Sequence, residues 1–249
     1  MNIEQLLGSQ TAKKGFQNED DIVAKFNNWK SDEDAQKWLI IMQYDITKIE
    51  YVKALKLSGY KTDVQIQVTI KMSDAIDAQN LQVKLVSNPK GFNQIDKRWV
   101  DKYVEMWNIP NDIVSILKRY TGEIQPTILN PQDKRRMFAN EFSQPEQAQI
   151  LKWLNENKSL IVSDILKGRG QFAAEWTLVA QKLKESSRWI LKPMNYCLNY
   201  FGNGEVEITP RGNFKIARIT MQRKGGDGGR ITANMLQFKI NPAELFDEA

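Results

Sequence analysis

The chain has 249 residues, of which 41% are hydrophobic, and this is enough for one large domain with its own core. It contains no histidine and a single cysteine, which excludes Ser-His-Asp and Cys-His catalysis, histidine or cysteine zinc sites, iron–sulfur sites and intrachain disulfides. The net charge of +5 makes the chain mildly basic. Without histidine, the groups left for catalysis are carboxylates, amides, lysines, hydroxyls or a bound metal ion.

The first part of the chain predicts two helices followed by a β region. Residues 17–30 carry an apolar stripe at helical spacing, with Asn18 as the N-cap and acidic residues in the first turn. A second helix is expected over 33–42. Residues 64–70 and 81–86 alternate strictly between apolar and polar side chains. This alternation predicts two strands with one face in the core and the other face towards solvent.

The rest of the chain mixes helical and strand-like segments. Helices are expected over 98–107, 111–120, 131–141, 144–157 and 173–183. Strands are expected over 160–166, 187–191, 205–209, 214–222 and 231–240. A glycine-rich turn at 224–230 separates the last two strands. Without internal repeats or linkers, these elements predict a single α+β domain over 1–249, with a mixed central β-sheet flanked by helices.

Three polar side chains fall on the polar faces of the two predicted strands over 64–70 and 81–86. Asp63 opens the first strand, and Gln82 and Lys84 lie on the second. If the strands pair around a turn near their midpoint, Asp63 falls close to Lys84. Asp63, the Gln82 side-chain oxygen and the Val83 carbonyl can then bind Mg²⁺, a cation that prefers oxygen ligands. Lys84 can activate a water or neutralise charge on a phosphoryl group, so the cluster suits metal-assisted phosphodiester hydrolysis.

The spacing of these three residues is a weak signal by itself. The alternative is an exposed strand face that carries ordinary polar residues. Gln82 also stands where nuclease sites of this design usually have an acid, so we expect weaker metal binding until DNA supplies phosphate oxygens.

Longer segments around the cluster are more specific. They are LSGYKTD (57–63), QVKLVSNPKGFNQIDKRW (82–99), DKRRMF (133–138), EFSQPEQ (141–147), GRGQFAAEW (168–176) and QRKGGDGGRITANMLQFKI (222–240). In these segments the sequence resembles the Type II restriction endonucleases of the HinP-one-I group. That group cuts GCGC and is related to the CCGG-cutting MspI group within the PD-(D/E)xK nuclease superfamily.

The resemblance implies a PD-(D/E)xK fold and a Mg²⁺-dependent DNA endonuclease with Asp63, Gln82 and Lys84 as catalytic residues. Glu19 matches a helical glutamate placed near the metals in related nucleases, although it can equally serve as a charge at a helix N-terminus. Thr62 stands where the group has serine, which keeps the hydroxyl. The glycine-rich turn has one extra glycine, so the expected target is GCGC or a related GC-containing site.

Three groups of side chains are expected to contact double-stranded DNA. Backbone phosphates need basic side chains, and the candidates are Lys134, Arg135, Arg136 and Arg169. Base edges need forked or amide side chains, and the glycine-rich turn offers Gln222, Arg223, Lys224, Asp227 and Arg230. The loop after the second strand adds Phe92, Asn93, Gln94 and Lys97, with Phe92 as a wedge against a base step. The alternatives are a solvated helix face, a plain hairpin tip and a core position for Phe92.

Three functions remain in competition. The first is a sequence-specific restriction endonuclease, the second a less specific repair nuclease of the same fold, and the third a non-catalytic DNA-binding subunit. The basic turn argues against the second, and the presence of all three catalytic side chains argues against the third. The chain can also be one DNA-cutting or nicking subunit of a two-chain restriction enzyme.

The partners follow from the restriction hypothesis. We expect double-stranded DNA, a homodimer or a partner subunit, and a companion DNA methyltransferase in the same host. The beginning of the chain lacks the basic-then-apolar pattern of a signal peptide, and no apolar run reaches the roughly 18 residues of a membrane span. We therefore expect a cytoplasmic location.

Overall fold

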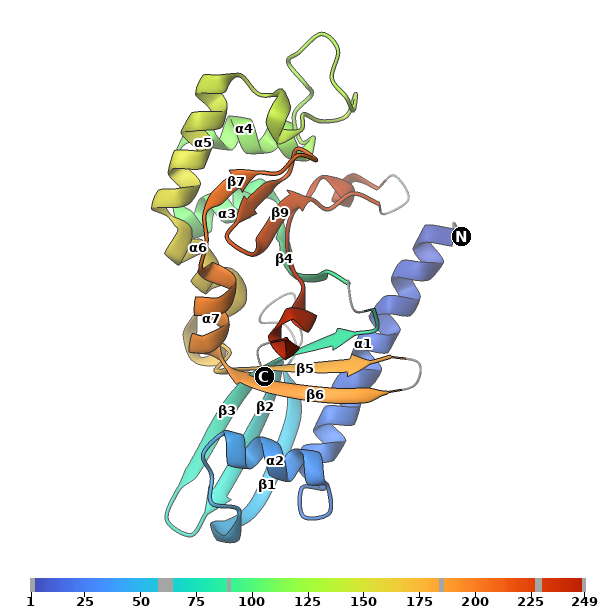
Figure 1. The fold of residues 1–249 in the computed structure, drawn as a ribbon, viewed down its shortest axis with the longest axis vertical. Helices are drawn as coiled ribbons and strands as arrows, with labels where there is room; N and C mark the ends of the chain where they lie inside the picture. Colours follow the sequence, from blue (N-terminus) through green and yellow to red (C-terminus); the bar gives the residue numbers. More distant parts are fainter. Residues whose placement is uncertain (1–2, 58–64, 89–90, 184–185, 227–229, 248–249) are drawn as a thin grey trace. The chain divides into compact units, whose positions relative to one another are not determined.

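The computed structural model describes residues 3–57, 65–88, 91–183, 186–226 and 230–247 (Figure 1). The chain divides into two compact units. The first-sheet unit comprises Leu7–Asn93, Leu166–Cys197 and Asn241–Ala249. The second-sheet unit comprises Met1–Leu6, Gln94–Ile165 and Leu198–Ile240. Within the described ranges, no helix has the length and apolar character that crossing a membrane requires.

The first-sheet unit contains a five-stranded mixed sheet with the order β1-β2-β3-β5-β6. The strands are β1 (Ile49–Leu57), β2 (Gln65–Met72), β3 (Ile76–Val86), β5 (Trp176–Lys182) and β6 (Ser187–Pro193). The pairs β1–β2, β2–β3 and β5–β6 are antiparallel, whereas β3 and β5 are parallel. A parallel pair needs a long crossover connection, so β3 and β5 bring together segments that are far apart in the sequence.

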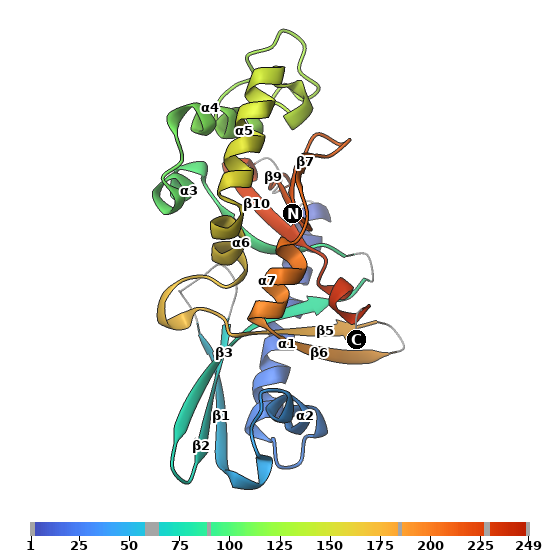
Figure 2. The ribbon, with the colours of Figure 1, turned by 60° about the vertical axis from the view of Figure 1, so that its left-hand side comes forward.

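Two helices cover one face of this sheet (Figures 1 and 2). They are α1 (Ile3–Asn27) and α2 (Glu33–Ile41), and the short 3-10 turn η1 (Ile46–Lys48) leads from α2 into β1. The rings of Phe26 and Trp38 pack at a tilted angle with centroids 5.2 Å apart, in a core that also holds alternate residues of β2 and β3. Because α1 begins well before residue 17, Asn18 lies inside the helix and is buried rather than capping it.

The second-sheet unit contains a five-stranded sheet with the order β4-β10-β9-β8-β7. Its strands are β4 (Asn93–Arg98), β7 (Val206–Ile208), β8 (Phe214–Ile216), β9 (Ile219–Arg223) and β10 (Leu236–Ile240). The prediction of an α+β fold is therefore confirmed, but the strands form two sheets and not one central sheet. The reason is that the C-terminal strands pair with one another and with β4, a segment that we expected to be a loop.

Helices α3 (Val100–Trp107), α4 (Asn111–Thr121), α5 (Gln144–Glu156) and α6 (Lys158–Leu166) belong to the same unit, and α7 (Met194–Gly202) begins at the end of β6. Phe238 of β10 packs edge-on against the stacked rings of Tyr103 and Trp107. The remaining short elements are 3-10 turns: η2 (Ala139–Glu141), η3 (Gly170–Phe172), η5 (Ile231–Asn234) and η6 (Pro242–Phe246).

Three predicted elements are wrong. Residues 131–141 do not form a helix, because the Asp133 carboxylate accepts hydrogen bonds from the backbone and side chain of Arg135 and holds a turn. Residues 160–166 belong to α6, since a short apolar run does not distinguish a buried helix from a strand. Residues 173–183 contain β5, whose pairing on both sides overrides the helical propensity of its alanines.

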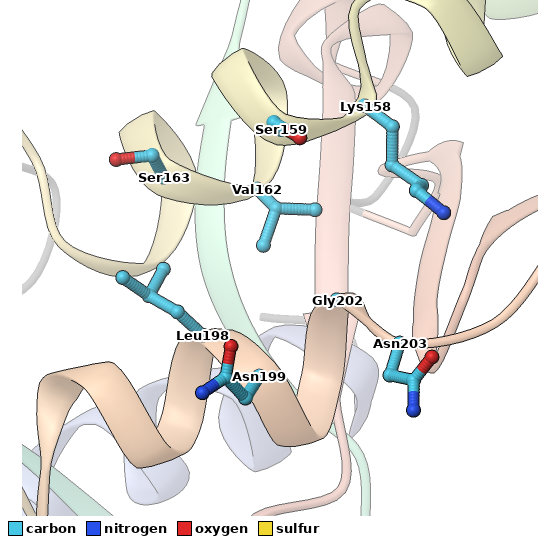
Figure 3. Close-up of a pocket in the computed structure, with 8 residues that line it drawn as sticks. All are labelled: Lys158, Ser159, Val162, Ser163, Leu198, Asn199, Gly202 and Asn203. Atoms are coloured by element: carbon cyan, nitrogen blue, oxygen red, sulfur yellow. The ribbon is translucent and has the colours of Figure 1, made fainter.

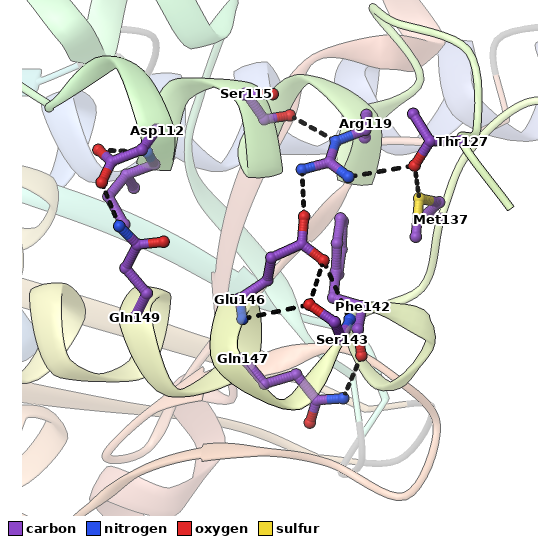
Figure 4. Close-up of polar contacts among 11 residues, drawn as sticks. Asp112, Ser115, Arg119, Thr127, Met137, Phe142, Ser143, Glu146, Gln147 and Gln149 are labelled. Carbon is purple, nitrogen blue, oxygen red and sulfur yellow. Dashed lines mark hydrogen bonds and ion pairs between the residues drawn. The ribbon is translucent and has the colours of Figure 1, made fainter.

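A polar network fixes the start of α5 (Figure 4). Ser143 and Glu146 form a capping box: the Glu146 N–H donates to Ser143 Oγ, and the Ser143 N–H donates to Glu146 Oε2. Arg119 of α4 donates from Nη2 to Glu146 Oε1 at 2.6 Å. Burial alone would raise the pKa of Glu146, but the hydrogen bonds from Ser143 and Arg119 hold it below its usual value.

Replacing this carboxylate tests the network. Glu146→Ala should lower the free energy of unfolding by about 1–2 kcal/mol at neutral pH, because it removes a cap and a partly buried ion pair. A depressed pKa in the folded state contributes stability that is complete above the unfolded pKa of about 4.5 and is lost as the pH falls through the folded value. The difference from wild type in urea denaturation should therefore shrink below about pH 4.5.

Glu156→Ala is the matched control, because Glu156 lies on the same helix and its ion pair with Lys152 is exposed. That variant should stay within about 0.5 kcal/mol of wild type. A difference for Glu146→Ala that persists unchanged into strong acid would contradict the proposed role of the carboxylate charge.

Candidate active site

Strand β3 carries Gln82 and Lys84 on the same face, as the alternation predicted. Their neighbours on β5 in the parallel register are Thr177 and Val179. The expectation that this face meets solvent is wrong: Gln82 is 2% exposed and Lys84 4% exposed. Both side chains therefore lie in a low-dielectric environment, where electrostatic interactions are strong.

The burial of this face has an identifiable cause. Gln181 of β5 follows Thr177 and Val179 on the same face, and its side-chain oxygen accepts a hydrogen bond from Arg188 of β6. The Arg188 guanidinium lies 4.3 Å from the ring centre of Phe246 in η6. The C-terminal segment thus covers the face opposite α1 and α2.

Gln82 has an unsatisfied side-chain oxygen. Its Oε1 atom is buried and accepts no hydrogen bond from any described residue. An orphaned buried acceptor costs free energy, and such atoms in native proteins commonly serve a ligand. A neutral oxygen is also a donor that Mg²⁺ accepts, so Gln82 fits the metal site that the sequence predicts.

The third catalytic candidate, Asp63, lies outside the described residues. Strand β2 begins at Gln65, whose Cα partner is Gln82. In the part of the chain that the structure describes, no three His, Cys, Asp or Glu side chains form a group able to hold a metal ion. The Val83 side chain packs in the core, and its backbone lies between the two polar residues.

Helix α1 brings Glu19 to the carboxyl end of the sheet. Asp20 pairs with Lys56 of β1, and Asp21 pairs with Lys182 of β5 at 2.6 Å. Because β2 and β3 lie between β1 and β5, this turn of α1 lies across the strands that carry the candidate site, on the opposite face from Gln82 and Lys84. Glu19 lies inside α1 and is only 9% exposed, so the alternative of a charge at the helix N-terminus does not hold. Its catalytic role remains a prediction.

Sequence reasoning missed Asn80, which lies on β3 two residues before Gln82. The Asn80 side-chain nitrogen donates to the carbonyls of Gln171 and Ala173, and its backbone N–H donates to Glu175. The residue thereby fastens to β3 the loop that contains the predicted DNA contact Arg169, which is exposed. An isolated asparagine on a strand gives no signal of this role, because its partners are distant in sequence.

The second-sheet unit brings together two predicted DNA-binding segments. Arg223 at the end of β9 donates from Nε to the Thr121 carbonyl at 2.9 Å and from Nη2 to Asn234 Oδ1 at 2.7 Å. Burial, reinforced by the charges of Arg135 and Arg136, lowers the pKa of the Arg223 guanidinium. The segment at 133–138 therefore lies beside the predicted base-reading strand.

The basic residues at 134–136 make different contacts. Arg135 forms a two-pronged contact with Asp133, whose pKa it lowers to about 2. Arg136 stacks 3.9 Å from the ring centre of Phe138, and Lys134 is exposed. Lys134 and Arg135 can therefore reach a phosphate, whereas Arg136 is partly occupied by packing.

The glycine-rich turn continues the β9–β10 ladder. The Lys224 N–H donates to the Met235 carbonyl, and Gly225 and Gly226 both have positive φ, which favours glycine. Arg230 is exposed, whereas Asp227 lies outside the described residues. Gln222 points away from the face that carries Arg223, and its Cα partner is Gln237 of β10.

The loop after β3 presents Phe92, which is 56% exposed, so the core alternative for this ring does not hold. Asn93 and Gln94 begin β4, and Lys97 lies within the same strand. The Asn93 side-chain nitrogen donates to the Gly91 carbonyl at 3.5 Å. Their roles in base reading remain predictions.

Two further features lie apart from these residues. Cys197 is buried beside Thr177, and burial raises the pKa of its thiol to about 11, which makes the thiol unreactive at neutral pH. A cavity of about 510 Å³ opens between α6 and α7 (Figure 3). Its lining residues include Val162, Ser163 and Asn199, and none of the predicted site residues contributes to it.

Comparison with known proteins bears on this site. The family model described as R.HinP1I restriction endonuclease matches residues 42–246. The fold is similar to that in the crystal structure of restriction endonuclease MspI in complex with its cognate DNA. The TM-score is 0.58 at 14% sequence identity, over 86% of this chain and 80% of that chain. No curated protein matches the sequence.

The contacts of Arg223 generate a prediction about stability. Arg223→Gln should lower the free energy of unfolding by about 1–3 kcal/mol in the absence of DNA, because Thr121 and Asn234 lose a charged donor. Arg230→Gln, an exposed arginine at the same turn, should change it by less than about 0.5 kcal/mol. Urea denaturation measures both. Equal effects in the two variants would show that Arg223 does not hold the end of α4.

Proposed function

Because the chain belongs to the R.HinP1I restriction endonuclease family, and is thus a Type II site-specific deoxyribonuclease, we propose that it cuts double-stranded DNA with Mg²⁺ at a short GC-rich site. The preferred target is GCGC or a related GC-containing sequence. The single observation that carries the proposed chemistry is the orphaned, buried Gln82 oxygen beside Lys84 on one face of β3.

Chain connectivity supports the assignment of Asp63 to this site. Asp63 precedes Gln65 by two residues, so their Cα atoms are separated by at most about 7 Å. Gln65 is in turn the Cα partner of Gln82. A carboxylate within reach of Gln82 supplies the negative charge that a neutral amide lacks.

The residues divide the chemical work as follows. Asp63, Gln82 Oε1 and the Val83 carbonyl hold the metal, with Glu19 as a further carboxylate at this end of the sheet. Bound Mg²⁺ supplies a Lewis acid that polarises the scissile phosphodiester. Lys84 donates to the attacking water or to a phosphoryl oxygen, and its burial strengthens the stabilisation of the charge that develops there.

DNA recognition uses both units. Lys134, Arg135 and Arg169 contact phosphates, and this makes binding salt-dependent. Around the glycine-rich turn, Lys224 and Arg230 suit the guanine acceptors, and Asp227 suits the cytosine amino group. The loop after β3 adds contacts to bases beside the cut site, and the residues that make them are Phe92, Asn93, Gln94 and Lys97.

The cellular setting belongs to the same proposal. A site-specific nuclease must be kept from cutting its own genome, so a companion methyltransferase and a cytoplasmic location fit the function. A homodimer, or a second subunit, would allow both strands to be cut. Mapping the ends of plasmid fragments produced with Mg²⁺ distinguishes these possibilities. Discrete GC-rich ends support the proposal, nicks indicate a missing subunit, and a smear indicates a non-specific nuclease.

Substitution of the carboxylate tests the catalytic assignment. Asp63→Ala should reduce the cleavage rate by at least about 100-fold while leaving the affinity for DNA within a few-fold of wild type, because the residue acts on the metal and not on the backbone. Asp74→Ala is the matched control, since Asp74 is an exposed acid at the β2–β3 turn. Full activity of Asp63→Ala would overturn the active-site assignment.

Gln82→Glu offers a test of the metal that does not depend on loss of activity. The added carboxylate should tighten Mg²⁺ binding, so the metal concentration for half-maximal cleavage should fall by about tenfold. Titration of each variant from a chelator-treated sample measures this. An unchanged metal requirement would remove Gln82 from the set of ligands.

A further inference from the structure

The second sheet has a polar face that opposes its aromatic core. Leu236, Phe238 and Ile240 of β10 lie on the core side, and strand alternation directs Gln237 and Lys239 to the other side, where Gln237 is 5% exposed and Lys239 is half-buried. The strand registers define two rows across this face. One row holds Glu207, Lys215, Thr220 and Lys239, and the other holds Gln222 and Gln237.

The two lysines in the first row are in different electrostatic situations. Lys215 Nζ lies 3.1 Å from Glu207 Oε1, so its charge is neutralised within the row. Lys239 has no ion pair with any residue that the structure describes, and its register partner is the uncharged Thr220. Lys215 thus has an acidic neighbour, whereas Lys239 has none among the described residues.

Lys239 is half-buried in β10. Burial lowers the pKa of its ammonium, and no carboxylate in the described part of the chain offsets that effect. Desolvating a charge without a partner costs free energy, and such a position persists where a ligand supplies the opposite charge.

We propose that Lys239 binds a phosphate of the DNA backbone, on a surface formed by the polar face of β9 and β10. The inference rests on the proposed function. Gln222, a predicted DNA contact, lies on this face two residues beyond Thr220, and Lys224 follows β9 in the chain and donates its N–H to the Met235 carbonyl. A duplex that binds the glycine-rich turn would therefore place a backbone phosphate near Lys239. Because phosphates carry no base identity, the contact positions the duplex without selecting its sequence.

The test compares charge removal at the two lysines of one row. Lys239→Met keeps the aliphatic stem and removes the charge, whereas Lys215→Met removes a charge that is already paired. Binding to a duplex with the mapped site, and to a scrambled duplex, is measured by fluorescence anisotropy in a metal chelator from about 50 to 200 mM salt. The chelator prevents cleavage during the measurement.

Lys239→Met should weaken binding to both duplexes by about tenfold and reduce the slope of log affinity against log salt by about 0.9, which corresponds to one lost phosphate contact. Lys239→Arg should restore the slope, and Lys215→Met should leave it unchanged. Without DNA, Lys239→Met should melt at the same temperature as wild type or higher, because a desolvated charge is gone.

Three results would overturn the inference: an unchanged slope for Lys239→Met, an equal loss for Lys215→Met, or weakening on only one of the duplexes. Lys239→Gln serves as the second variant if the methionine variant does not fold. A wild-type protein that binds neither duplex would instead overturn the proposed function itself.

Discussion

The architecture depends on the central strand β3, which is bonded on both sides and covered on both faces. Its antiparallel partner β2 directly precedes it in the chain, whereas its parallel partner β5 comes about a hundred residues later (176 against 76 at the strand starts). Cores of this kind normally exclude polar side chains, yet Gln82 and Lys84 lie inside this one. Their burial is costly for the fold, and under the proposed function it would hold both groups rigidly in a low-dielectric site.

Strand parity could be read from the sequence because alternation is a local property. It put Gln82 and Lys84 on one face of a strand, as the structure has them. It could not give their burial, since that depends on η6, a segment more than 150 residues away (242 against 84). The same limit explains the error at β5. Its alanines favour a helix locally, but the pairing with β3 and β6 decides its structure.

The basic cluster of the second-sheet unit shows a related limit. Arg135, Arg136 and Arg223 were each expected to contact DNA, but their proximity follows from the fold and not from spacing. Arg223 donates hydrogen bonds to Thr121 at the end of α4 and to Asn234. A side chain whose chemistry suits base reading therefore also stabilises the fold. The Ser143–Glu146 capping box is by contrast a local feature, because the pair satisfies its own backbone within one turn.

The unsatisfied oxygen of Gln82 would couple the folding equilibrium to the binding of a ligand at this atom. A buried acceptor without a donor raises the free energy of the folded state by about 1–3 kcal/mol, and a species that binds it recovers this amount. If Gln82 holds the metal as proposed, solution conditions that fill the site shift the folding equilibrium towards the native state by mass action, and chelating conditions shift it back. The neutral member of the proposed catalytic trio would then link the stability of the protein to the ionic composition of its surroundings.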